Sequence, residues 1–138
     1  MKRFGVMSAL LSLVTGSLSI AGGPDGATIF RAKCQLCHTT RQVTPAQREK
    51  LLGPPIDEVV LKVKEKYPIR EDAIRFIADY IRTPSIDKAL CPSLDRYGLM
   101  PSMEKTLTEE EAKCVAKMLV EKKLSGEDRK KDLSPPRQ

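Results

Sequence analysis

The pentapeptide Cys34-Gln35-Leu36-Cys37-His38, a C-x-x-C-H motif, is the feature that most constrains what this chain can fold into. Cysteines three positions apart lie on one face of a helical turn, and here an imidazole follows at once. This spacing is typical of c-type haem attachment, in which both thiols form thioethers and the histidine binds iron. Simpler interpretations are a dithiol redox pair, half of a zinc site, or a disulfide.

His38 is the only histidine among the 138 residues, so a second histidine cannot supply the sixth iron ligand. A chain of this length forms at most one domain. It is 41% hydrophobic, with no Trp, three Phe and three Tyr, which is little apolar material for a core. A buried porphyrin would fill part of that volume.

The N-terminus resembles a secretory signal. Lys2 and Arg3 precede an apolar run over 4–18, and small residues lead to a cleavage site after Ala21. We predict a signal peptide at 1–21 and export to the periplasm, with an uncleaved anchor as the alternative. Any other membrane contact is expected only through partners. The remaining chain has a net charge of +4 and no nucleic-acid recognition motif.

Two further cysteines, Cys91 and Cys114, remain outside the motif. Export into an oxidising compartment favours a disulfide between them. The alternative is a pair of buried, reduced thiols.

Apolar periodicity and end signals predict an all-α chain. Pro24 and Asp25 begin a first helix, and the last helix starts at a capping box formed by Thr108 and Glu111. A domain over 22–124 would precede a charged, disordered tail at 125–138. The four predicted helices cover 25–37, 57–66, 71–82 and a segment from 108 to about 124, and a long loop covers 85–107.

A helix that ends in C-x-x-C-H, a Gly-Pro loop, a Met-Pro loop and a terminal amphipathic helix follow one another here. In this order the landmarks resemble the class I cytochromes c over residues 24–123. The resemblance implies a small bundle of about four helices around one covalently bound haem. It also implies that Cys34 and Cys37 form the thioethers and that His38 is an axial ligand of the iron.

The resemblance assigns two further residues. Pro54 matches the proline whose carbonyl holds the other imidazole nitrogen, and Met100 matches the second axial ligand. Met103, in the same loop, is the rival to Met100.

Two filled axial positions leave one-electron cycling of the iron as the expected chemistry, so we expect a carrier rather than an enzyme. It would shuttle electrons between periplasmic redox partners, a donor and an acceptor with acidic docking surfaces. Three alternatives stay open: a sensor or enzyme with a labile distal ligand, a thiol oxidoreductase using Cys34 and Cys37, and a subunit of a larger oxidoreductase.

Overall fold

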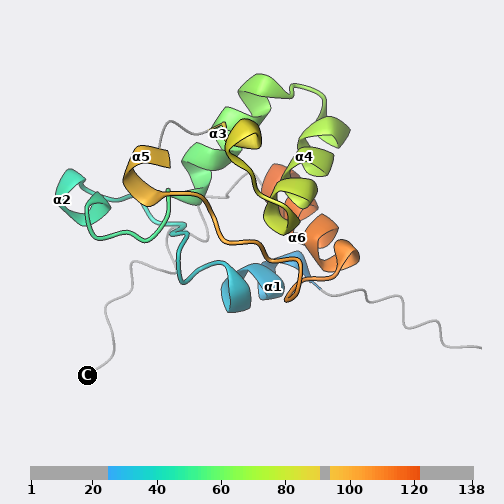
Figure 1. The fold of residues 1–138 in the computed structure, drawn as a ribbon, viewed down its shortest axis with the longest axis horizontal. Coiled ribbons are helices and arrows are strands. Elements are labelled where there is room, and N and C mark those ends of the chain that lie inside the picture. The colour runs from blue at the N-terminus through green and yellow to red at the C-terminus, as the bar shows by residue number, and fades with distance from the viewer. Residues whose placement is uncertain (1–24, 91–93, 122–138) are drawn as a thin grey trace, which may run out of the picture.

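The computed structural model describes residues 25–90 and 94–121 (Figure 1). Within them the chain is helical and contains no strand, which confirms the all-α prediction. The elements are α1 (Gly26–Lys33), α2 (Pro45–Arg48), α3 (Ile56–Lys66), α4 (Arg70–Arg82), the 3-10 turn η1 (Ile86–Lys88), α5 (Leu94–Tyr97) and α6 (Glu109–Glu121). None of these helices is both long and apolar enough to cross a membrane.

Three predictions fall wholly or partly outside the described residues. These are the signal peptide at 1–21, the tail at 125–138 and the disulfide, since Cys91 is not described. Cys114 lies half-buried on α6. All three stay predictions.

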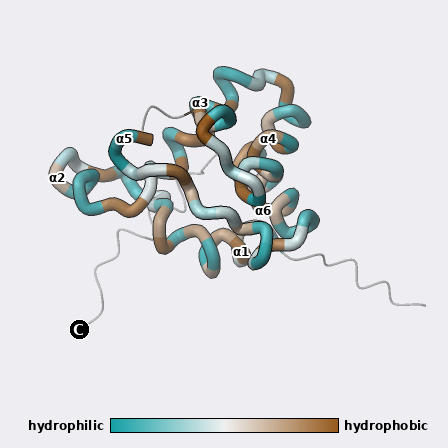
Figure 2. The backbone as a smooth tube through the Cα atoms, viewed as in Figure 1, coloured by the Kyte–Doolittle hydropathy of each residue, from teal (hydrophilic) through white to brown (hydrophobic). Residues whose placement is uncertain are grey.

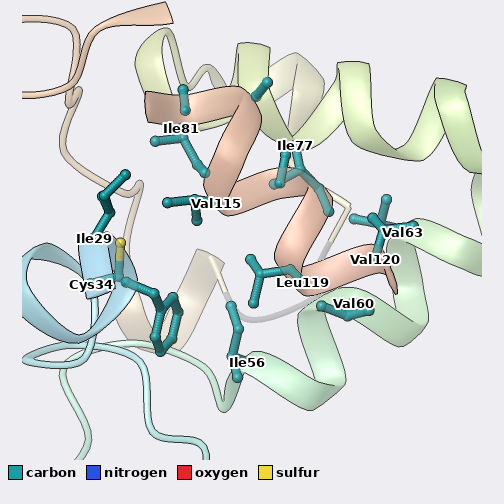
Figure 3. Close-up of a cluster of buried hydrophobic side chains, with 14 of the residues drawn as sticks. Ile29, Cys34, Ile56, Val60, Val63, Ile77, Ile81, Val115, Leu119 and Val120 are labelled. Atoms are coloured by element: carbon teal, nitrogen blue, oxygen red, sulfur yellow. The ribbon is translucent and has the colours of Figure 1, made fainter. Parts of the chain in front are cut away.

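The core is formed where α6 packs against α1, α3 and α4 (Figure 3). Along α1, α3, α4 and α6, hydrophobic and hydrophilic residues are interspersed (Figure 2), and the buried hydrophobic ones form the core. The predicted stripes on α4 and α6 supply much of this core, including Ile77, Ile81, Val115 and Leu119. Burying one such side chain stabilises the fold by about 1.5–3 kcal/mol, so these faces determine how the helices pack.

The first and last helices cross at Gly26. A Cβ built at this position would lie 2.2 Å from the carbonyl oxygen of Cys114, a distance that no real Cβ tolerates. Only glycine lets α1 approach the α6 backbone this closely.

The helix starts follow the predicted capping. Asp25 accepts hydrogen bonds from the amides of Ala27 and Thr28 at the start of α1. At α6 the amide of Glu111 donates to the Thr108 hydroxyl at 3.1 Å, and the Thr108 amide donates to the Glu111 carboxylate at 2.8 Å. The capping box is therefore confirmed.

One predicted helix boundary and one predicted loop differ from the structure. The first helix ends at Lys33 rather than 37, because the carbonyl of Phe30 accepts from both Cys34 and Gln35, so the regular ladder stops there. The loop over 85–107 is not structureless, since it contains η1 and α5.

The segment that follows α5, residues 98–107, is called the strap here. It begins at Gly98, whose φ of +69° suits glycine, and ends at the fully buried Leu107. In Figure 1 the strap is the orange segment that runs from α5 to α6 and, in this view, passes between α1 and α4.

Candidate functional site

The C-x-x-C-H motif forms a tight turn directly after α1. Cys34 is the C-terminal cap of the helix, and its carbonyl accepts from the amide of Cys37 at 3.1 Å and from that of His38 at 2.9 Å. Cys34 and Cys37 are free thiols, and both line the same cavity. Figure 3 shows Cys34 beside Ile29 at the end of α1, among the core side chains. One helical turn thus presents two sulfurs to one space.

The imidazole of His38 is held from behind by the Gly-Pro loop. Its Nδ1 lies 2.8 Å from the carbonyl oxygen of Pro54, the contact that the resemblance implies. A carbonyl only accepts hydrogen bonds, so Nδ1 carries the proton and Nε2 keeps its lone pair for a metal.

Gly53 makes this approach possible, a role that the sequence analysis missed. A Cβ at Gly53 would lie 3.2 Å from the Cys37 carbonyl oxygen and 3.3 Å from Cε1 of His38. A side chain there would press on the imidazole. The adjacent prolines signal a stiff loop, but they do not show that the loop lies against the ring.

Burial raises the pKa of the Cys34 thiol, and the neighbouring Cys37 adds to the rise, while Lys33 opposes it. The thiol therefore stays protonated at neutral pH. Thiols that act in disulfide exchange are instead poised toward the thiolate.

A cavity lies behind the motif. The space free of protein atoms there is about 1090 Å³, open solvent at its mouth included. Cofactor pockets are mostly apolar with a few placed polar groups. Its apolar walls come from α1, α3, α4, α5, α6 and the strap, and include Phe30, Ile56, Val59, Val60, Val63, Phe76, Ile77, Ile81, Leu90, Leu94, Val115 and Leu119.

The two candidate methionines differ in position. Met100 is half-buried and lines the cavity together with Leu99 and Pro101. Met103 is not among the lining residues. Its amide donates to the Ile81 carbonyl at 3.1 Å, and its sulfur lies 3.7 Å from the Thr106 hydroxyl. Met103 packs against the core and anchors the strap, whereas Met100 faces the cavity.

The short helices α2 and α5 are tied together near the cavity. Arg48 of α2 forms a two-pronged ion pair with Glu58 of α3, with N–O distances of 2.8 and 2.5 Å. The hydrogen bonds from Arg48 lower the pKa of the Glu58 carboxyl. The hydroxyl of Tyr97, a cavity residue on α5, lies 3.5 Å from the Arg48 carbonyl oxygen.

These residues fit a covalently bound haem. Two thiols lie on one turn beside an apolar cavity, an imidazole presents a free Nε2, and a thioether lines the same cavity. Over residues 25–90 and 94–121, no three His, Cys, Asp or Glu side chains gather as a metal site built from those residues would need.

An "Uncharacterized protein" of Aquifex aeolicus (strain VF5) is 34% identical to this chain over 105 residues. The match covers 66% of the chain and 68% of that protein. The chain belongs to the same family as this Aquifex protein. Its printed name attaches no activity to the family. No protein-family model matches the chain, and no solved structure matches it.

Proposed function

We propose that the protein is a mono-haem c-type cytochrome that carries single electrons between exported redox partners. One observation carries the proposal: Met100 lies more than 60 positions from Cys34, Cys37 and His38 in the sequence, yet all four residues line one apolar cavity. The fold brings the only histidine of the sequence and this methionine to the same cavity as both cysteines, and a haem site needs this arrangement.

Each residue has a distinct role in the proposal. Cys34 and Cys37 would anchor the group through thioethers, and His38 and Met100 would hold its iron. Pro54 holds the imidazole in the required tautomer, and Gly53 provides the space. When bound, the haem supplies reversible one-electron chemistry between ferric and ferrous iron.

The surroundings favour electron transfer over substrate chemistry. The apolar walls from α3, α4 and α6 exclude water and disfavour additional charge. A thioether ligand favours the ferrous state and raises the potential. If His38 and Met100 both held the iron, protein side chains would take the positions that a substrate would need.

The surface near the mouth suits docking of a redox partner. Leu52 and Leu99 line the cavity and still have 66% and 42% of their surfaces exposed. The net positive charge of the chain would steer partners with acidic surfaces toward it, most strongly at low ionic strength. The donor and the acceptor are proposed only by this chemistry.

A thiol oxidoreductase is the weaker proposal. Such enzymes place a C-x-x-C pair with a lowered pKa beside a β-α-β unit. Here the pKa of Cys34 shifts upward, and the described chain is helical. A protein with a labile distal ligand, or a subunit of a larger oxidoreductase, would use the same cavity.

The test is an absorption spectrum of the oxidised and reduced protein, made together with a c-type haem attachment system. We expect a covalently bound haem in a six-coordinate, low-spin state. Met100→Ala should remove the sulfur-to-iron absorption band and open the iron to carbon monoxide, whereas Met103→Ala should keep the band. A compactly folded, colourless protein would refute the proposal, and loss of the band only in Met103→Ala would move the ligand to Met103.

A further inference from the structure

The strap is fastened to the end of α4 by three consecutive residues. The Ser102 hydroxyl donates to the Arg82 carbonyl at 2.5 Å, and the Met103 amide donates to the Ile81 carbonyl at 3.1 Å. The Glu104 carboxylate lies 3.9 Å from the Arg82 guanidinium. The carbonyls at a helix C-terminus have no partner within the helix, so the strap satisfies groups that α4 itself cannot.

Ser102 is the residue of this group that is nearest to Met100 in the sequence. Its hydroxyl also accepts a hydrogen bond from the Glu104 amide at 3.3 Å, so both its donor and its acceptor functions are used. Only Pro101 separates it from Met100.

Pro101 makes a stiff connection between the two. Its ring fixes its own φ, and it restricts the preceding Met100 to extended conformations. Fewer backbone rotations between Ser102 and Met100 are therefore available to absorb a displacement of Ser102.

We propose that Ser102 is a positioning residue that holds Met100 toward the cavity through its hydrogen bond to the Arg82 carbonyl. The proposal rests on the proposed function, because it concerns the residue that would bind the iron on the strap side. Without this bond the strap samples conformations in which the Met100 sulfur lies away from the cavity, and an external ligand competes more successfully for its place.

The test compares Ser102→Ala with Thr83→Ala in the haem-loaded protein. Thr83 is a matched control, because its exposed hydroxyl also donates to a carbonyl near the end of α4, that of Asp79, at 3.1 Å, and this bond lies within α4 and its C-cap rather than between α4 and the strap. Imidazole is the probe, since it binds ferric iron only where the methionine has left.

We expect Ser102→Ala to raise the affinity for imidazole about three- to tenfold, the effect of one hydrogen bond. Thr83→Ala should leave that affinity unchanged. Ser102→Thr, which keeps a hydroxyl at this position, should show the wild-type affinity. Hydrogen exchange at the Met103 amide, a readout independent of iron, should become faster in Ser102→Ala only. In a Pro101→Ala background the effect of Ser102→Ala on imidazole binding should shrink.

Equal imidazole affinities in Ser102→Ala, Thr83→Ala and the wild type would overturn the inference while leaving the proposed function intact. A spectrum unaltered by Met100→Ala would overturn the inference and move the ligand away from Met100, and a compactly folded, colourless wild-type protein would overturn the proposed function as well. The two failures are thus distinguishable in one set of variants.

Discussion

The two sides of the cavity are built in different ways. On the histidine side, the motif and the loop that orients it are close in sequence, with His38 and Pro54 16 positions apart. On the methionine side, the strap is held across longer separations: 20 residues from Ser102 to Arg82, and 73 from Thr106 to Lys33, whose ammonium donates to the Thr106 carbonyl. The histidine side depends mainly on local structure, whereas the strap depends on the completed fold. We therefore expect the strap to open first.

The comparison predicts its largest effect for His38 and Met100, the two residues proposed to hold the iron. His38→Ala should prevent stable incorporation of the haem, because no other histidine exists to replace it. Met100→Ala should retain the covalent haem and change only its coordination. Haem staining after denaturing electrophoresis, together with absorption spectra, measures both results. A normal spectrum in His38→Ala would show that the histidine side is not the proximal side.

Two glycines provide the next contrast. Gly53→Ala should cost about 1–3 kcal/mol of unfolding free energy and shift the haem spectrum, because the added methyl group presses on the Cys37 carbonyl and the His38 ring. Gly98→Ala should cost about 1–2 kcal/mol through its positive φ alone, since no atom lies within 4 Å of its Cβ position.

Denaturant titrations give both free energies. Gly98→Asn serves as the control, because asparagine tolerates positive φ better than alanine and should lose less stability. An unchanged spectrum in Gly53→Ala would contradict the proposed pressure on the imidazole.

The smallest effect concerns the ion pair between α2 and α3. Arg48 lowers the pKa of Glu58 below its ordinary value of 4.5, so the pair stabilises the fold above that pH. This contribution is lost as the pH falls through the lowered pKa of the folded state. Glu58→Gln should therefore reduce the melting temperature at neutral pH, and the difference from the wild type should vanish once the pH falls below the lowered pKa of Glu58 in the folded state. A difference that persists in acid would mean that the side chain acts through packing instead.

The sequence predicts the helices and one side of the cavity well, because both are encoded locally. Periodic stripes mark α4 and α6, and the Thr108 capping box marks the start of α6. The helix α2 was missed although Thr44 and Gln47 form a capping box of the same kind. A closer search for this pattern would have found it.

The contacts of the strap could not be predicted in the same way. Nothing in the residues around Ser102 indicates that its hydroxyl meets the end of α4, since the partner is a backbone carbonyl, which carries no sequence signal. The close approaches at Gly26 and Gly53 are hidden for the same reason. A glycine permits many conformations, and only the packed structure shows which neighbour requires it.

The crossing at Gly26 has a consequence for the order of folding. The helix that covers α1, α3 and α4 is the last described element of the chain, so most of the apolar surface synthesised earlier stays uncovered until α6 arrives. The contact between Gly26 and Cys114 cannot form until α6 has been synthesised, and contacts of such large sequence separation slow folding. Until α6 packs, the unfolded chain stays accessible to factors that act on unfolded polypeptides.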